Sequence, residues 1–240
     1  MPDTAPFVLT DDHALPCAAD TALDRARAGA VTLLARATPA LWLLALAAVW
    51  AMSGNLAVMG MGGAVFSLLA LLGTRAAPAT GRILVAQGLT GLTISLNAAL
   101  AGHPMQIYSH MAYFASLAML VVLADITPLL VAAGTIALHH LLLTFSMPAL
   151  VYPSSDLLFN VGRTLFHAVI VVAETAMLVI AVRNRLALSR EAVEQARENR
   201  AATARAEQNS ARAEAAVAES REAHQRAEAE GHAAAEARDA

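Results

Sequence analysis

The sequence predicts an all-α membrane protein, a bundle of six transmembrane helices followed by a cytoplasmic Ala-rich helix. Three observations predict it. The 240 residues are 58% hydrophobic. Only 15% are charged, against about 25% in soluble domains. The charge also gathers at the C-terminus, because residues 185–240 hold 9 of the 16 basic residues and 11 of the 19 acidic ones. An ordinary soluble domain and a disordered chain are therefore both excluded.

Six apolar stretches have the length of about 20 residues that a membrane span requires. They are separated by short segments rich in Gly, Pro and polar residues. The predicted spans are 33–53, 55–74, 83–102, 107–124, 127–147 and 163–183. We therefore expect three parts, a polar N-terminal tail over 1–30, a six-helix transmembrane domain over 31–184 and a cytoplasmic helical stalk over 185–240. The first residues carry acidic side chains and no signal-peptide pattern, so we expect them to form a loose tail.

The distribution of Arg predicts the orientation of the spans, since basic residues collect on the cytoplasmic side. With both termini inside, the outer side receives only Arg163. The inner side then receives Arg25, Arg27, Arg36, Arg75, Arg82, Arg183, Arg185 and Arg190. The three Tyr, at 108, 113 and 152, fall near the outer interface, as an aromatic belt would. The net charge of −3 gives no sign of a nucleic-acid partner.

The C-terminal segment from 185 is dominated by Ala, Glu, Arg and Gln and contains no Pro, so it predicts a helix. Small residues recur at heptad spacing, with charged residues of both signs beside them. One seam position reads Ser189, Ala196, Thr203, Ser210, Val217 and His224. The other reads Ala192, Asn199, Ala206, Ala213, Ser220, Ala227 and Ala234. Such a seam favours a weak coiled coil in a homodimer. The alternative is a solvated single helix held by charge pairs along its own surface.

Ionisable residues within membrane spans are rare and by default functional. We expect His110, His139, His140 and His167 to lie at similar depth in the outer half of the membrane, with Glu174 deeper on the helix of His167. Imidazole commonly binds transition metals, and two His on facing helices can hold the iron of haem b. Nearby Met residues would favour copper. A hydrogen-bonded structural network or a proton-linked one is the alternative.

The stretch from about 103 to 178 resembles a membrane sensor region of bacterial methyl-accepting chemotaxis proteins, also found ahead of histidine kinases and diguanylate cyclases. The resemblance rests on the segments IYSHMAYFASLAML, ADITPLLVAAGTIALHHLLLTFSMPALVYP and TLFHAVIVVAETAML. The matching positions are His110, Asp125, His139, His140, His167 and Glu174. The resemblance implies a sensor in the bacterial inner membrane. Its output would be a chemotaxis kinase and adaptor, or a C-terminal domain that this sequence lacks.

These observations predict a sensory receptor that is not an enzyme, with the four His as candidate metal ligands and Glu174 beside them. The cluster would sense a metal, a haem-linked or redox signal, or a change of protonation. The resulting change would pass from the cluster to the stalk. A b-type cytochrome that transfers electrons is the alternative, although electron transfer needs no coiled coil. A metal or proton transporter ranks last, because the inner halves of the spans hold few polar residues.

Overall fold

The computed structural model describes the backbone of residues 14–152 and 156–239 and the side chains of 22–152 and 156–230. The described residues are almost all helical and include no strand, which confirms the predicted all-α class. The helices are α1 (Ala14–Ala51), α2 (Leu56–Gly73), α3 (Pro78–Ala99), α4 (Gln106–Ser109), α5 (Met111–Met119), α6 (Ile126–Ser146) and α7 (Leu157–Asp239), with short 3-10 helices η1 (Leu120–Leu123) and η2 (Pro148–Leu150).

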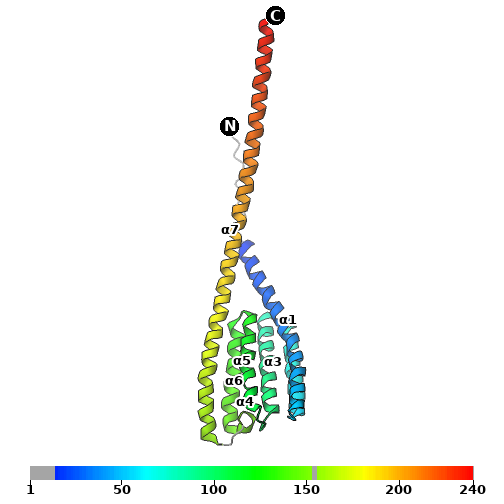
Figure 1. The fold of residues 1–240 in the computed structure, drawn as a ribbon, viewed down its shortest axis with the longest axis vertical. Coiled ribbons are helices and arrows are strands. Elements are labelled where there is room, and N and C mark those ends of the chain that lie inside the picture. Colours follow the sequence, from blue (N-terminus) through cyan, green and yellow to red (C-terminus); the bar gives the residue numbers. More distant parts are fainter. Residues whose placement is uncertain (1–13, 153–155, 240) are drawn as a thin grey trace. The chain divides into compact units, whose positions relative to one another are not determined.

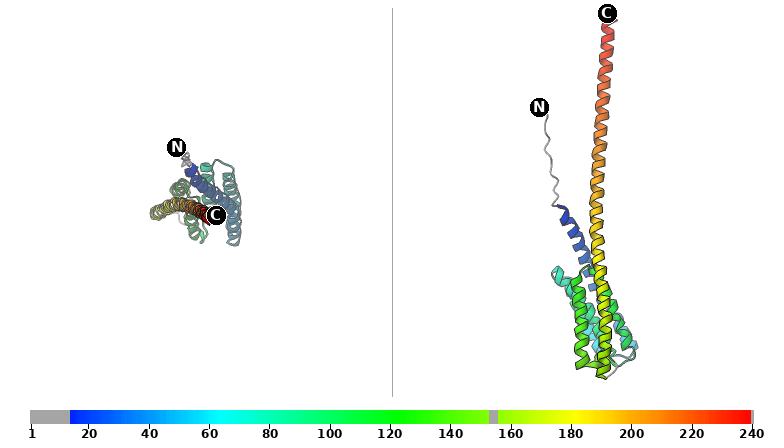
Figure 2. Two further views of the ribbon diagram at one scale, coloured as in Figure 1. Left: turned by 90° about the horizontal axis from the view of Figure 1, so that it is seen from above. Right: turned by 90° about the vertical axis from the view of Figure 1, so that its left-hand side faces the viewer.

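The chain divides into two units, Met1–Ala187 and Leu188–Ala240. In the first unit the helices run side by side as a bundle, with α3 and α5 between α1 and α6 (Figure 1). Figure 2 shows this bundle from two further directions. The described part of the second unit, through Asp239, is helical and belongs to α7. Its helical structure agrees with the prediction for the stalk.

Among the described residues, five helical stretches are long and apolar enough to cross a membrane, so the chain is a membrane protein. Four of them are α1, α2, α6 and α7, and the fifth is the stretch Gln106–Leu123. That fifth stretch differs from the prediction of one helix over 107–124. It comprises α4, α5 and η1, and the junction of α4 with α5 falls at His110.

The bundle is built around α3, which packs against α1, α2, α5 and α6. Every residue of the chain from 81 to 100 is buried or half-buried. Because protein and not lipid surrounds α3, its surface can be small and polar, with residues such as Thr90, Ser95 and Asn97 fully buried. This explains how α3 belongs to the bundle although it is not among the five candidate membrane spans.

Glycines let α2 and α3 approach closely. A Cβ on Gly88 of α3 would lie 2.7 Å from the carbonyl oxygen of Phe66 on α2. A Cβ on Gly63 would collide with the Trp42 ring of α1, whose indole N–H donates to the Met59 carbonyl at 3.1 Å. Gly60 faces open space instead. The small residues therefore set the spacing of α1, α2 and α3.

Two helices extend well beyond the apolar stretches that predict them. The loose tail predicted for the first residues is wrong from Ala14 onward, because α1 begins there. Residues 1–13, the rest of that predicted tail, lie outside the described residues. Helix α7 begins at Leu157 and continues past the predicted span. Hydropathy marks only the part of a helix that contacts lipid, so polar helical extensions escape it.

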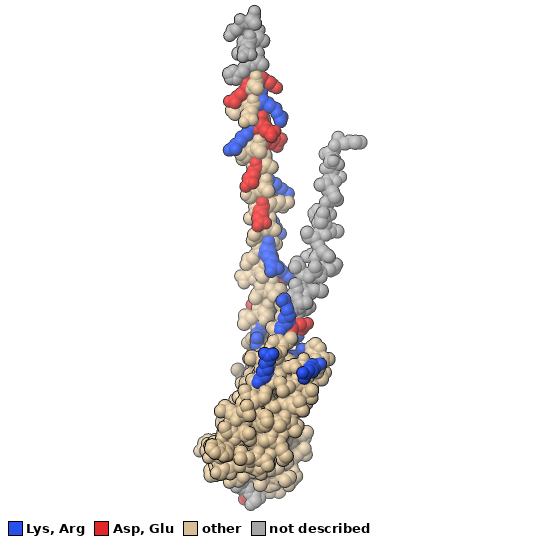
Figure 3. Space-filling view, turned by 90° about the vertical axis from the view of Figure 1, so that its right-hand side faces the viewer, with Lys and Arg blue, Asp and Glu red and all other residues tan. Residues whose placement is uncertain are grey.

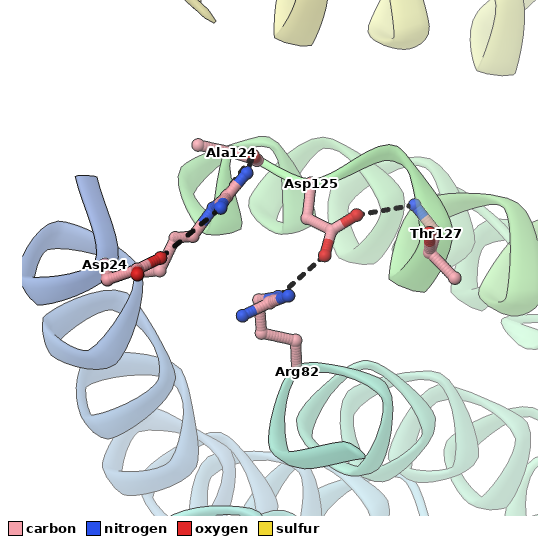
Figure 4. A network of polar contacts seen from close by, with 6 residues as sticks. Asp24, Arg82, Ala124, Asp125 and Thr127 are labelled. Atoms are coloured by element: carbon pink, nitrogen blue, oxygen red, sulfur yellow. Dashed lines mark hydrogen bonds and ion pairs between the residues drawn. The ribbon is translucent and has the colours of Figure 1, made fainter. Parts of the chain in front are cut away.

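Arginines gather at one end of the first unit (Figure 3). In Figure 4, Arg82 of α3 donates to the Asp125 carboxylate at 2.6 Å, and Asp125 accepts from the Thr127 amide at 2.9 Å as the N-cap of α6. The guanidinium of Arg27 donates to the Ala124 carbonyl at 2.9 Å. Arg185 of α7 donates to the Val121 carbonyl at 3.3 Å. The turn from η1 to α6 is thus held by charged groups from α1, α3 and α7.

Candidate functional site

The rings of His110, His140 and His167 lie together, although they come from three parts of the chain. The ring centroids of His110 and His140 are 5.6 Å apart, those of His110 and His167 are 6.2 Å apart, and those of His140 and His167 are 5.0 Å apart. His110 sits at the junction of α4 and α5, while His140 lies on α6 and His167 on α7. We refer to these three residues as the histidine cluster.

Of the adjacent His139 and His140, it is His140 that belongs to the cluster. Consecutive residues on a helix point about 100° apart, so only one of them can face the bundle interior. His140 is 3% exposed. His139 is half-buried, and its ring contacts the His140 ring at 5.4 Å but neither of the other two. His139 therefore borders the cluster from outside.

A backbone hydrogen bond fixes the proton of His140. Its Nδ1 lies 2.9 Å from the Ile136 carbonyl oxygen, one turn earlier on α6. Because a carbonyl oxygen only accepts, Nδ1 carries the proton and donates. In the neutral imidazole the lone pair is then on Nε2. His140 therefore presents a hydrogen-bond acceptor, or a metal ligand, to the interior of the cluster.

The Nδ1 of His110 has two neighbours that require opposite proton positions. It lies 2.9 Å from the Gln106 carbonyl oxygen and 3.0 Å from Nδ2 of Asn97 on α3. Donation to Gln106 needs a proton on Nδ1, whereas accepting from Asn97 needs a lone pair there. Only one of these bonds forms at a time. The Nε2 of His110 can therefore act as acceptor or donor, according to which neighbour Nδ1 engages.

Four buried polar atoms of the histidine cluster and of Tyr113 find no hydrogen-bond partner among the residues that the structure describes. They are the Nε2 atoms of His110, His140 and His167 and the hydroxyl oxygen of Tyr113. The Tyr113 ring is 5.1 Å from the His140 ring and 5.8 Å from the His110 ring. Buried polar groups are nearly always hydrogen-bonded, so such a group of four calls for a bound partner.

Several residues that complete the site escaped the sequence prediction. The Tyr152 ring stacks over His110 with centroids 6.2 Å apart, and its hydroxyl is 2.8 Å from the Thr164 hydroxyl. The Phe114 ring meets His167 at 5.5 Å. Tyr113 is 1% exposed, so it is a core residue and not part of an aromatic belt. Asn97 of α3 lies within hydrogen-bond distance of His110, a cluster residue.

Other predicted site residues stay apart from the cluster. Glu174 is two helical turns beyond His167 on α7, about 10 Å along the axis, and its Oε2 is buried with no partner in the described chain. The Met residues do not gather there either. Met59 belongs to a separate core with Val49 and Leu92. Others are exposed, among them Met61, Met105, Met111 and Met147. Within the described residues no group of three or more His, Cys, Asp or Glu is arranged to hold a metal ion.

An apolar groove reaches the cluster from the side. It has a volume of about 730 Å³ and lies between α6 and the membrane-spanning part of α7. Small residues on both helices create the space, among them Gly134 and Ala137 on α6 and Ala168 on α7. Both His140 and His167 line it, and no Arg, Asp or Glu does. The cluster is thus accessible from an apolar environment.

Comparisons with family models, with curated proteins and with solved structures find no match to this chain. Its function must therefore be argued from the geometry of the site.

Proposed function

We propose that this chain is a membrane sensory receptor of the chemotaxis-receptor type. One observation carries the proposal: His167, a member of the histidine cluster, lies on the same helix that continues into the C-terminal segment. A change of packing around His167 therefore acts on α7 directly. The resemblance of residues 103–178 to chemotaxis sensor regions supports the same reading.

The receptor spans the inner membrane of a bacterium six times, with both termini in the cytoplasm. Helix α3, the third span in chain order, completes the six, although it is not among the five apolar candidates. Its 22 residues extend about 33 Å, enough for a hydrocarbon core of about 30 Å. Its envelope of α1, α2, α5 and α6 removes the need for an apolar surface. The arginines around the turn from η1 to α6 face the cytoplasm.

The histidine cluster is the sensory site. His110, His140 and His167 would hold a redox-active group, which supplies a charge or a change of oxidation state inside the bundle. A metal ion would require the three rings to move closer together, because their described arrangement is not a metal site. Their unpaired Nε2 atoms are the donors such a group requires. His139 borders the site through its contact with the His140 ring, and Glu174 lies two helical turns away from His167 on α7. A stimulus shifts the equilibrium between two packings of α7 against the bundle, and this requires only different affinities for the two packings.

The stalk after residue 185 pairs with that of a second copy. Its seam residues are small and exposed, so the paired state is weak and a small shift of α7 can alter it. Charge pairs along one helix, such as Arg226 with Glu222 at 3.0 Å, stabilise the helix of each stalk. The output is a chemotaxis kinase with its adaptor, or a cytoplasmic signalling domain.

Disulfide cross-linking within membranes tests the sensor proposal. Ala206→Cys, a seam position, is placed in the full chain with Cys17→Ser, and Gln208→Cys gives an off-seam comparison. We expect cross-linking of Ala206→Cys to exceed that of Gln208→Cys. We further expect the yield at Ala206→Cys relative to that at Gln208→Cys to change when membranes are moved between less and more oxidising conditions, given copper, or shifted from neutral to mildly acidic pH. The ratio is the readout because redox state, copper and pH act directly on thiol oxidation at both positions.

Two histidine variants separate a specific response from a general one. His167→Ala should abolish the stimulus-dependent change, while His103→Ala, outside the cluster, should preserve it. A visible spectrum and elemental analysis of the same preparations would identify haem or a metal. An equal yield of cross-linking at the two Cys positions, or a ratio of the two yields that no stimulus changes, would overturn the proposal.

A further inference from the structure

The groove between α6 and α7 has the character of a binding site for a lipid-soluble molecule. Its walls are hydrocarbon over nearly their whole surface, contributed by residues from Leu130 on α6 to Ile180 on α7. Both helices are membrane-span candidates, so the groove lies within the hydrocarbon layer. A ligand would reach it laterally from the bilayer rather than from water.

The polar end of the groove defines the head group that fits there. His140 is 3% exposed and presents an Nε2 lone pair, since its Nδ1 proton is engaged by Ile136. A bound head group must therefore donate a hydrogen bond to it. The Nε2 of His167 lines the same end and is also without a partner in the described chain. Thr164, beside them, already bonds to Tyr152 at 2.8 Å.

The surroundings favour a flat, uncharged head group. The two rings that line this end of the groove, those of His140 and His167, have centroids 5.0 Å apart and are tilted by 30° to each other, so a flat ring packs well against them. No basic side chain that could pair with the carboxylate of a fatty acid lines the groove. An ionised lipid head would therefore be buried without a counter-charge, which costs free energy.

We infer that the groove binds an isoprenoid quinol, with its hydroxyl donating to Nε2 of His140 and its tail lying between α6 and α7. This inference rests on the proposed sensor function and names the ligand of the same cluster. The reduced form is the one recognised, because a quinone presents carbonyl lone pairs toward the His140 lone pair. The receptor would thus report how reduced the membrane quinone pool is, by binding alone and without electron transfer.

The test uses the full chain in lipid nanodiscs prepared from quinone-free lipids. Decylubiquinol and decylubiquinone are titrated separately under anaerobic conditions, and bound ligand is counted by chromatography after the discs are isolated. Empty discs correct for ligand dissolved in the lipid. We expect saturable binding of the quinol, about tenfold or more tighter than of the quinone, since a site with an unpaired acceptor discriminates strongly for a hydroxyl group.

Two variants with a matched control locate the binding. Gly134→Leu fills the groove from α6, and its first side-chain atom meets nothing within 4 Å, so it should fold and lose saturable binding. Gly60→Leu on α2, equally unobstructed but outside the groove, should bind as the native chain does. His140→Leu should remove the preference for quinol over quinone. Equal binding of the two forms, or binding unaffected by Gly134→Leu, would overturn the inference.

The failure of this inference can be told apart from the failure of the sensor proposal. If quinol does not bind but stalk cross-linking still responds to copper or pH through His167, only the ligand is wrongly assigned. If quinol binds as described but no stimulus, quinol included, alters the cross-linking, the ligand site stands and the sensor function falls.

Discussion

At the scale of single residues, Asp125 makes two stabilising contacts at the arginine-rich end of the bundle. Its carboxylate caps the N-terminus of α6 through the Thr127 amide and pairs with Arg82 of α3. Burial alone would raise the pKa of this carboxyl group, but the hydrogen bonds from Thr127 and Arg82 and the charge of Arg82 together lower it. The ionised form is therefore the one that stabilises the fold.

We predict that Asp125→Asn destabilises the detergent-solubilised protein by about 1–3 kcal/mol at neutral pH, from the lost charge-assisted bond and the weaker cap. A pKa lowered in the folded state means that the stabilisation is present above the unfolded pKa of about 3.9. It is lost as the pH falls through the folded value. Thermal unfolding against pH should therefore show the native chain and the variant converging in acid.

A control and a contrary outcome complete that experiment. Asp24→Asn changes a carboxylate that is 70% exposed and 3.5 Å from Arg27, and should cost little. If Asp125→Asn proved as stable as the native chain at neutral pH, the pairing with Arg82 would not be a structural contact.

The residues of the candidate site differ in how visible they are in the sequence. The histidines could be predicted, because an ionisable residue stands out in an apolar span. Tyr113 and Tyr152 could not, since an aromatic side chain near a span end fits an interfacial belt equally well. The choice of His140 over His139 also required the structure, because it depends on the rotation of α6 about its axis.

At the scale of elements, the spacing of α2 and α3 depends on glycine. A Cβ on Gly88 would lie 2.7 Å from the Phe66 carbonyl oxygen and 2.9 Å from the Ala70 amide nitrogen, both of them backbone atoms. Backbone atoms of a packed helix cannot move aside independently. The two helices would have to separate, and the packing around α3 would loosen with them.

We predict that Gly88→Ala destabilises the protein by about 1–3 kcal/mol, as overpacking typically does. Gly60→Ala on α2 provides the comparison, because its Cβ meets nothing within 4 Å. There the helix propensity of Ala should give a gain of about 0.5–1 kcal/mol. Thermal unfolding in detergent would measure both. Equal effects of the two substitutions would show that α2 and α3 are not in close contact.

The prediction of the helices from sequence succeeded where lipid contact dictates hydropathy. The spans expected at 55–74 and 127–147 match α2 and α6 within a residue or two at each end. The prediction failed over Ala14–Gly29, because a helix outside the hydrocarbon needs no apolar run. The sequence also shows no sign of the junction between α4 and α5 at His110. There the Tyr113 N–H donates to the His110 carbonyl oxygen at 3.0 Å, a bond between residues three apart instead of four.

At the scale of the whole molecule, the arginine-rich turn and the histidine cluster lie at opposite ends of the first unit. The arginines that hold the turn from η1 to α6 lie at one end of the first unit (Figure 3). The cluster draws on residues near the end of α6 and the start of α7, which lie at the opposite end (Figure 1). In the proposed topology a signal enters near the outer face and leaves on the cytoplasmic side.

That topology can be measured with single cysteines. We predict that Ala77→Cys, between α2 and α3, reacts with a membrane-impermeant maleimide only when the inner face of the membrane is exposed. Ala101→Cys, between α3 and α4, should react from outside in intact cells. Both positions are exposed in the structure, and both variants carry Cys17→Ser so that no other thiol responds. The opposite orientation would reverse the two patterns.

Labelling of both positions from the same side would show that α3 does not cross the membrane, since these two residues flank it. That result would reduce the proposed bundle to fewer than six spans and place the arginine-rich turn and the histidine cluster in a different relation to the two faces of the membrane.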